Sequence, residues 1–388
     1  MCARTTPSFR IRVSRRDAAR HFFPLESLER TLDILWLYRL NRLHLHLTDD
    51  QGWRLSVPGY PKLTDVGAWR SNGTSEDERY GGFYSAEELR ALDASARALG
   101  ITIVPEIDLP GHATAAVSAY PELLCSRERR EVETRWGIFD AVLCVSRDTT
   151  MRFIEAVFAA VAEQFSGPYI HIGGDEVLRS GWDACPDCSR RDDPYQEIVA
   201  AMCTTVLRLG RRPVAWDEAS GLNLPRETII INWRTPDAAA RALERGYDLV
   251  LAPESRCYLD RRHRDSPLEP GRLSTCTVVD SASFAPTRYV AASGAGDIAR
   301  RDTGTAAATG AANGAATILG GQANLWTEEI LYHSQFEYMA LVRLAAIAEG
   351  LWTGEPAAER PGFYENLDAL RRALWRRGYD VYPGPLTE

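Results

Sequence analysis

The stretch SAEELRALDASARALGITIVPEIDLPGH, residues 85–112, holds one helix–strand unit of the fold. Ser85 and Glu88 have the spacing of a capping box, in which the serine hydroxyl accepts the third helical N–H and the glutamate reaches back. Gly100 suits the left-handed position that ends a helix. Residues 101–104 then form an apolar run of strand length. The unit therefore predicts a capped helix followed directly by a buried strand.

The same alternation continues on both sides of this unit. About eight strands alternating with helices predict the α/β class, specifically a (β/α)8 TIM barrel. An open doubly wound sheet is the structural alternative, but no Gly-x-Gly-x-x-Gly follows the first strand to support it. We expect strands at 11–13, 43–47, 101–104 (bounded by Pro105), 169–172, 213–216, 229–231, 248–251 and 318–325, and further helices at 25–39, 148–165, 194–209, from about 236, 335–350 and 363–376.

Length alone does not decide the number of domains, because 388 residues suit two or three domains of average size or one large α/β barrel. The 388 residues are 45% hydrophobic and 25% charged, which is enough to bury a substantial core. We expect a single barrel domain over residues 1–388, with no separate N-terminal domain. Residues 291–317 are mostly Ala, Gly and Thr, and we expect them to form a low-complexity surface loop.

Charge and residue usage exclude several functions. The net charge of −8 argues against a nucleic-acid partner held by phosphate neutralisation. Lys62 is the only lysine among 45 basic residues, and its context fits neither a phosphate-binding loop nor Schiff-base chemistry. No apolar stretch is long enough to span a membrane. Residues 1–20 lack the apolar segment of a secretory signal, so a cytoplasmic location is expected unless the natural start lies upstream.

The cysteines give no clear metal signature. Cys185 and Cys188 form a lone CxxC pair, whereas a structural zinc site normally brings a second pair or histidines at fixed spacing. We therefore expect a loop disulfide or two free thiols there, and no metal or cofactor. Cys125 and Cys144 flank one loop and could pair with each other. The eight cysteines are Cys2, Cys125, Cys144, Cys185, Cys188, Cys203, Cys257 and Cys276.

Polar and aromatic residues gather where the predicted strands end, which is where barrels of this type carry their active sites. Several ends combine an aromatic residue with a carboxylate or amide. Aromatic faces stack on sugar rings and carboxylates bind hydroxyls, so this pattern indicates a carbohydrate pocket. The segments are 48–54, 105–112, 171–176, 216–218, 232–233, 258–260 and 324–328.

The sharpest motif is Gly173-Gly174-Asp175-Glu176. Two glycines allow the backbone to turn, so both carboxyl groups can face the pocket. Crowding and burial should raise the pKa of at least one of them, as a general acid requires. Adjacent side chains cannot easily take opposite faces of a sugar ring, as an ordinary retaining pair must. One acid combined with a nucleophile supplied by the substrate resolves this difficulty.

With these motifs in place, the sequence resembles the β-N-acetylhexosaminidases of glycoside hydrolase family 20, whose members take part in chitin and amino-sugar degradation. The resemblance covers nearly the whole chain. It rests on Arg12 with 17–23, and on segments 41–54, 105–112, 171–176 and 321–328.

The resemblance implies removal of terminal β-linked N-acetylglucosamine or N-acetylgalactosamine by substrate-assisted catalysis through an oxazolinium intermediate. Glu176 would be the acid and base, and Asp175 would hold the 2-acetamido N–H. The other implied roles are Asp108 and His112 supporting the acid, Tyr258 steadying the acetamido carbonyl, Trp216, Trp233 and Trp326 enclosing the sugar, Arg12 and Glu328 binding outer hydroxyls, and Asp260 assisting them.

The sequence departs from the family pattern at three places. Arg15 and Arg16 stand where relatives have apolar residues, and the stretch 261–273 lacks a pocket tryptophan that some relatives have. The family also usually has an α/β domain ahead of the barrel, whereas here the barrel begins near Met1.

Two other functions remain open. A catalytically impaired N-acetylhexosamine-binding protein would keep the same pocket. A metal-dependent hydrolase would use His44 and His46, which alternate on one strand face, together with His112 and His171.

Overall fold

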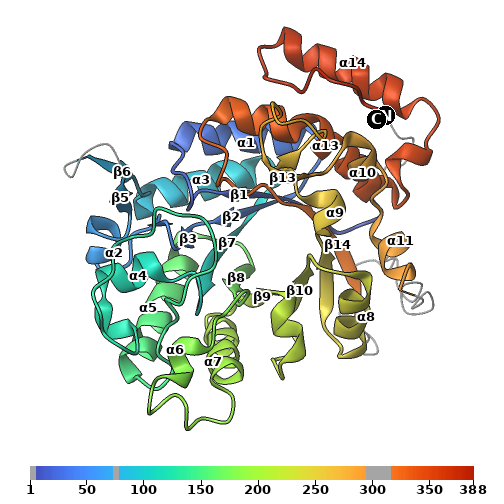
Figure 1. Cartoon of the computed structure of the whole chain (residues 1–388). Helices are drawn as coiled ribbons and strands as arrows, with labels where there is room; N and C mark the ends of the chain where they lie inside the picture. The colour runs from blue at the N-terminus through green and yellow to red at the C-terminus, as the bar shows by residue number, and fades with distance from the viewer. Residues whose placement is uncertain (1–5, 73–77, 294–315) are drawn as a thin grey trace. The chain divides into compact units, whose positions relative to one another are not determined.

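The computed structural model describes residues 6–72, 78–293 and 316–388. Eight parallel strands form a closed barrel in the order β1-β14-β11-β10-β9-β8-β7-β2, which confirms the predicted (β/α)8 class. Figure 1 follows the alternation of strands and helices along the chain from blue to red. The barrel strands are β1 (Ile11–Asp17), β2 (Arg42–His46), β7 (Thr102–Leu109), β8 (Tyr169–Gly173), β9 (Arg212–Trp216), β10 (Ile229–Asn232), β11 (Asp248–Leu251) and β14 (Ile318–Ala323).

The helices follow the predicted positions closely. The longer ones are α1 (Leu25–Leu37), α3 (Ala86–Ala98), α5 (Asp148–Gln164), α7 (Pro194–Arg208), α8 (Pro236–Glu244), α13 (His333–Thr353) and α14 (Phe363–Arg376). Short helices are α2 (Lys62–Asp65), α4 (Thr114–Ala119), α6 (Ser180–Asp183), α9 (Glu254–Cys257), α10 (Val278–Ala282) and α11 (Pro286–Ala291). Short strands outside the barrel pair as β3 (Thr48–Asp49) with β4 (Gly52–Trp53), β5 (Trp69–Ser71) with β6 (Arg79–Gly81), and β12 (Arg261–Arg262) with β13 (Arg272–Thr275).

The helix–strand unit at 85–112 forms as predicted at its start and runs further than predicted at its end. Both hydrogen bonds of the Ser85–Glu88 capping box are present. The prediction that Pro105 bounds the strand is wrong, because β7 continues to Leu109. A proline removes only its own backbone N–H from the hydrogen bonds between strands. The carbonyl of the next residue, Glu106, still accepts the N–H of Leu47 at 3.1 Å.

The end of strand β14 also differs from the prediction. Strand β14 ends at Ala323, and Asn324 instead exchanges backbone hydrogen bonds with Cys257 and Leu259. Helix α11 ends at Ala291, whereas most of the predicted 291–317 loop lies outside the described residues.

The chain divides into two compact units. Unit 1 comprises Met1–Arg16, Arg30–Leu43 and Ile230–Glu388, and unit 2 comprises Asp17–Glu29 and His44–Ile229. In unit 2, strands β7 and β8 pair in parallel with Glu106 beside His171 and Leu109 beside Gly173, so their carboxyl ends lie together. In unit 1, β1 pairs in parallel with β14, and Arg12 lies beside Gly321.

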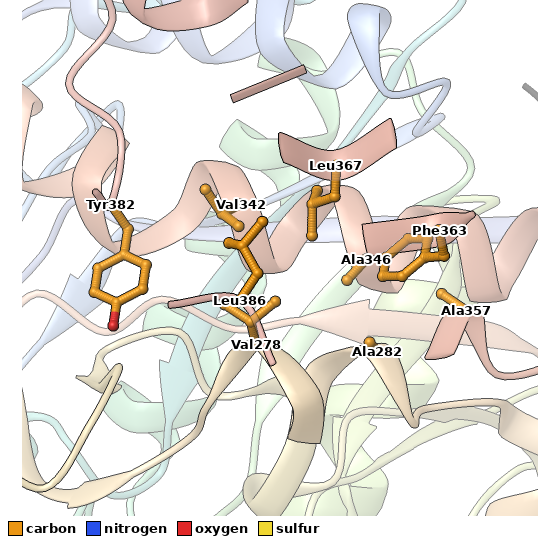
Figure 2. Close-up of a cluster of buried hydrophobic side chains, with 9 residues drawn as sticks. All are labelled: Val278, Ala282, Val342, Ala346, Ala357, Phe363, Leu367, Tyr382 and Leu386. Carbon is orange, nitrogen blue, oxygen red and sulfur yellow. The ribbon is translucent and has the colours of Figure 1, made fainter. Parts of the chain in front are cut away.

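The C-terminal part of unit 1 packs on an apolar cluster. Helix α13 is buried along most of its length, as expected for a helix that is apolar on several faces. Figure 2 shows the side chains that join it to its neighbours within the unit. They are Val278 and Ala282 of α10, Val342 and Ala346 of α13, Ala357, Phe363 and Leu367 of the α14 region, and Tyr382 and Leu386 of the C-terminal segment.

Among the described residues, no helix combines the length and the apolar character needed to cross a membrane.

Candidate active site

The Gly-Gly-Asp-Glu motif turns sharply at the carboxyl end of β8, as the sequence predicts. The φ angles are +76° at Gly173, +95° at Gly174 and +49° at Glu176. A Cβ at position 173 would stand 1.9 Å from Oδ1 and 2.7 Å from Cα of Asp108. Glycine at this position therefore gives the Asp108 carboxyl group the space it occupies between the two strand ends.

Asp108 and Asp175 form a buried carboxyl pair. Both side chains are almost fully shielded from solvent, and a carboxylate oxygen of each lies within 4.8 Å of the other. Burial raises the pKa of each group, and the Asp175 charge raises the pKa of Asp108 further. Two carboxylates so placed cannot both ionise easily, so the pair favours a form in which one of them keeps its proton.

His112 lies between two sets of carboxylates. Its Nδ1 is 3.2 Å from Oδ1 of Asp49 and 3.2 Å from Oδ2 of Asp50. Its Nε2 is 3.5 Å from Oε2 of Glu176 and 3.9 Å from Oδ2 of Asp175. Although burial lowers the pKa of His112, the surrounding carboxylates raise it well above the ordinary histidine value overall. The imidazole is therefore a cation at neutral pH.

The cationic His112 gives Glu176 the opposite behaviour from Asp175. The hydrogen bond from His112 lowers the pKa of Glu176, and the opposing effect of burial is smaller. The expectation that at least one pKa of the motif is raised is confirmed at Asp175. The carboxyl expected to act as the acid, Glu176, is instead ionised in the unliganded protein.

Arg20 is a residue of this cluster that the sequence analysis did not single out. Its guanidinium donates to Asp49 at 2.8 Å and lies 3.5 Å from Asp17, which ends β1. Asp17–Glu29 belongs to unit 2, as do the other residues of the cluster. Arg20 follows the first strand by three residues, so the strand-end rule applied to the other strands would have found it.

Arg12 does not reach the carboxyl ends of the strands. It is the second residue of β1, and its guanidinium donates to the backbone oxygens of Arg39 at 2.9 Å and Phe9 at 2.8 Å. It also lies 5.2 Å from the ring of Trp352. The residue is thus held at the amino end of its strand, away from the position that the expected hydroxyl-binding role requires.

Glu106 is a second residue that the sequence analysis did not assign. Its buried carboxylate lies 2.5 Å from Nδ1 of His46, 3.1 Å from Nε2 of His44 and 3.3 Å from Nδ1 of His171. It also accepts the indole N–H of Trp216 at 2.8 Å. The contacts of Glu106 therefore fix both the histidine cluster and the orientation of Trp216.

Metal ligation is geometrically possible in this network. Among the described residues, five groups of His, Cys, Asp or Glu bring their ligand atoms within 4.8 Å of one another, and four of these groups use the carboxylates and histidines above. Each of those four contains at least one carboxylate–imidazole ion pair. The fifth group consists of cysteines.

Unit 1 contains the other predicted sugar-binding residues in one neighbourhood. The ring centroid of Tyr258 lies 6.3 Å from that of Trp233 and 6.4 Å from that of Trp326. Tyr258 forms an isolated parallel β-bridge with Asn324, and burial raises its pKa well above the ordinary value. Tyr258 and Trp326 are buried and Trp233 is half-buried, so the three aromatic residues form one neighbourhood within unit 1.

Asp260 and Glu328 lie on either side of one arginine. Arg272 donates to Glu328 at 3.1 Å, and its Nε is 3.9 Å from Asp260. Burial, followed by the Glu328 charge, raises the pKa of Asp260 to about 7. Buried Arg343 holds the preceding loop by donating to the carbonyl of Leu259 at 2.7 Å.

The unusual pair Arg15 and Arg16 is accommodated within unit 1. Both side chains are fully buried. The guanidinium of Arg15 lies 3.4 Å from the ring centroid of Trp326, and that of Arg16 lies 3.8 Å from the ring centroid of Phe336. These cation–π contacts place charged groups in strand β1 without disrupting it.

A parallel barrel that carries two adjacent carboxyls and a histidine at its strand ends is typical of one class of barrel hydrolases. These enzymes use carboxyl side chains to cleave sugars. Comparison with known proteins gives the particular family. Residues 9–355 match glycosyl hydrolase family 20, catalytic domain, and the chain belongs to this family.

Curated relatives support the assignment over most of the chain. A β-hexosaminidase of Porphyromonas gingivalis is 33% identical over 98% of this chain and 48% of its own length. A β-hexosaminidase of Vibrio furnissii is 35% identical over 90% of this chain and 58% of its own length. The chain therefore spans about half the length of these relatives.

Solved structures show the same fold. The family 20 β-N-acetylhexosaminidase from Streptomyces coelicolor A3(2) has a TM-score of 0.81 at 28% identity, covering 98% of this chain and 72% of the other. The exo β-N-acetylglucosaminidase from Vibrio harveyi in complex with N-acetylglucosamine has a TM-score of 0.82 at 32% identity, covering 97% and 59%.

Proposed function

We propose that this chain is a retaining exo-glycosidase that removes terminal β-linked N-acetylglucosamine or N-acetylgalactosamine with the help of the substrate's own acetamido group. The observation that carries the proposal is the adjacency of Asp175 and Glu176 in the turn after β8, with His112 against Glu176. Two neighbouring carboxyls cannot act as acid and nucleophile on opposite faces of a sugar. Family membership and the N-acetylglucosamine bound to the Vibrio harveyi protein support the substrate class.

In the first step, Glu176 gives its proton to the glycosidic oxygen and the bond from that oxygen to the anomeric carbon breaks. The acetamido carbonyl oxygen forms a bond to the anomeric carbon, giving an oxazolinium ion. Asp175 accepts the acetamido N–H and stabilises the positive charge that develops on the group. In the second step, Glu176 takes a proton from water, which attacks the anomeric carbon and restores the acetamido group with overall retention.

The remaining residues bind and orient the sugar in this proposal. The family resemblance gives Trp216 in unit 2, and Trp233, Tyr258 and Trp326 in unit 1, the role of packing against the sugar ring and the N-acetyl group. Asp260 and Glu328 bind outer hydroxyls. Arg20 takes the arginine role that the sequence assigned to Arg12, because its guanidinium lies beside Asp49 at the carboxyl end of the barrel.

The test compares Glu176→Gln and Asp175→Asn with wild type on a chromogenic N-acetylglucosaminide and on the matching glucoside, which lacks the acetamido group. Each variant should lose about 10²- to 10⁴-fold in kcat/KM on the first substrate. Wild type should leave the glucoside uncleaved. An unchanged rate for Asp175→Asn would remove Asp175 from the mechanism.

Sugar binding without hydrolysis is a second candidate, and the lowered pKa of Glu176 favours it because an ionised carboxylate is a poor acid. Calorimetry with free N-acetylglucosamine separates the two functions. A protein that binds this sugar but cleaves no N-acetylhexosaminide, with wild type and Glu176→Gln alike, is a binding protein.

A further inference from the structure

Four cysteines from three separated places in the sequence come together in unit 2. They are Cys125, Cys144, Cys185 and Cys188, and their sulfur atoms all lie within 4.8 Å of one another. Three of the residues are buried, and Cys125 is partly buried. The sequence shows only the CxxC pair, because the folding of the long loop after β7 is what brings Cys125 and Cys144 beside it.

The sulfur spacing matches a tetrahedral metal site. Sγ of Cys188 is 3.6 Å from Sγ of Cys125 and 3.6 Å from Sγ of Cys144. Four thiolates each about 2.3 Å from a zinc ion stand roughly 3.8 Å apart at the corners of a tetrahedron. All seven cysteines among the described residues are free thiols, so the cluster is arranged as four separate ligands.

Polar groups around the sulfurs are oriented to stabilise thiolates. The backbone N–H groups of Asp187 and Cys188 donate to Sγ of Cys185, as expected where a CxxC turn wraps a metal. The backbone N–H of Ser146 donates to Cys144 and Cys188. Its hydroxyl lies 3.3 Å from Sγ of Cys144 and accepts from Sγ of Cys188 at 3.3 Å.

Cationic groups lie next to the cluster as well. The guanidinium of Arg147 donates to the carbonyl of Cys125 at 2.8 Å. The backbone N–H of Arg191 donates to the carbonyl of Cys188 at 3.1 Å, which places this residue beside the cluster. A zinc ion with four thiolates carries a net charge of −2, which two nearby arginines partly offset.

We propose that these four cysteines bind one structural zinc ion, each thiol releasing its proton to solvent as its sulfur coordinates the metal. Soft thiolate ligands in a closed tetrahedral set favour zinc held without an open position, so the ion has a structural role. The proposal is independent of the proposed glycosidase activity, since no cysteine of the cluster belongs to the candidate active site.

The position of the cluster indicates what the zinc stabilises. The N–H of Leu143, next to Cys144, donates to the carbonyl of Pro110 at 3.0 Å, two residues before His112. The indole of Trp182 on α6 donates to the carbonyl of Leu143 at 2.9 Å. Zinc therefore joins the segment that follows β7 to the segment that follows Glu176. It stabilises the loops that carry His112 and Glu176.

The first experiment measures metal in protein purified without a metal-affinity tag. Elemental analysis should find about one zinc per chain in wild type, and a Cys188→Ser variant should lose at least about 90% of it. Cys203→Ser is the matched control, because Cys203 is also buried but lies on α7 outside the cluster. It should keep its zinc.

A second experiment does not depend on folding of the serine variant. Wild-type protein loaded with cobalt(II) in place of zinc should show thiolate-to-cobalt charge-transfer bands and the intense visible bands of tetrahedral coordination. Titration with a mercurial that blocks thiols should release zinc as four thiols per chain react.

Three results would overturn the proposal. One is wild-type protein without zinc and without the cobalt bands. Another is full zinc content in Cys188→Ser, which would place the metal at the histidine and carboxylate groups. The third is a thiol count in denaturant without reductant showing that the four cysteines are oxidised to disulfides.

Discussion

Replacing Gly173 with alanine tests whether close packing at the end of β8 sets the geometry of the acid cluster. The new Cβ would stand 1.9 Å from Oδ1 and 2.7 Å from Cα of Asp108. The left-handed φ of +76° costs an alanine about 1–2 kcal/mol. Displacing a backbone atom of the neighbouring strand adds about 1–3 kcal/mol of overpacking. Gly173→Ala should therefore lower the free energy of unfolding by about 2–5 kcal/mol.

Gly100→Ala provides the matched control. Gly100 has a nearly identical φ of +73°, but no atom lies within 4 Å of its added Cβ. It should lose only the backbone cost of about 1–2 kcal/mol. Chemical denaturation followed by tryptophan fluorescence measures both variants. Since Asp108 must move by about 1 Å or more, Gly173→Ala should also lose about 10²-fold in kcat/KM, while Gly100→Ala stays near wild type. Equal stability and equal activity of the two variants would refute the steric argument.

Three other predictions follow from the charges and hydrogen bonds. His112→Asn removes the hydrogen bond that lowers the pKa of Glu176. The alkaline limb of the kcat/KM–pH profile should therefore move to higher pH while the maximum falls. A limb that stays in place would contradict the assignment of Glu176 as the acid. Arg54 is fully buried and donates to four backbone carbonyls at 2.6–3.0 Å. In chemical denaturation, Arg54→Met should therefore lower the free energy of unfolding by about 3 kcal/mol, against about 0–0.5 kcal/mol for the exposed control Arg90→Met. Similar losses in the two variants would show that the carbonyl contacts are not responsible. Burial raises the folded-state pKa of Asp260 to about 7, above its unfolded value. The stabilising contribution of the protonated carboxyl is therefore present at low pH and is lost as the pH rises from the unfolded pKa through about 7. Asp260→Asn should gain stability relative to wild type over this pH range, and a pH-independent difference would argue against the raised pKa.

Much of the fold could be predicted because its signals are local. The Ser85–Glu88 capping box and the strand at 248–251 depend on neighbouring residues alone, and both form as predicted. The continuation of β7 past Pro105 depends instead on a hydrogen bond from Leu47, nearly sixty residues away. Long-range pairing of this kind has no local signature, which is why the boundary was wrong.

The candidate site divides in the same way. Asp175 and Glu176 were found because two glycines and two carboxyls at a strand end form a local pattern. The assignment of Arg12 followed its spacing in a motif, but its direction in the strand sends the guanidinium to backbone carbonyls. Glu106 was missed because its role depends on contacts with His46 and Trp216, which come from other strands.

The excess of arginine over lysine also has a structural consequence. Arg54 and Arg343 are buried without a carboxylate hydrogen bond in the part of the chain described, and each donates to several backbone carbonyls. A guanidinium has five donors in a fixed plane, whereas an ammonium has three on a flexible chain and is more strongly hydrated. Lysine at these positions would leave carbonyls unsatisfied, so the composition fits buried loops held by guanidinium groups.

The proton that cleavage requires is held beside Glu176 in the unliganded protein. The carboxylates around His112 favour its protonated form, with its Nε2 3.5 Å from Glu176, and the raised pKa of Asp108 and of Asp175 favours a proton on that pair. The Glu176 side chain is 35% exposed, so a sugar covering it would remove water and raise its pKa. An acetamido N–H donated to Asp175 would favour the ionised form of that carboxyl and leave the shared proton on Asp108. In the proposed reaction, a substrate with the 2-acetamido group therefore prepares both carboxyls at once, whereas a sugar without it raises the pKa of Glu176 but offers no N–H to Asp175.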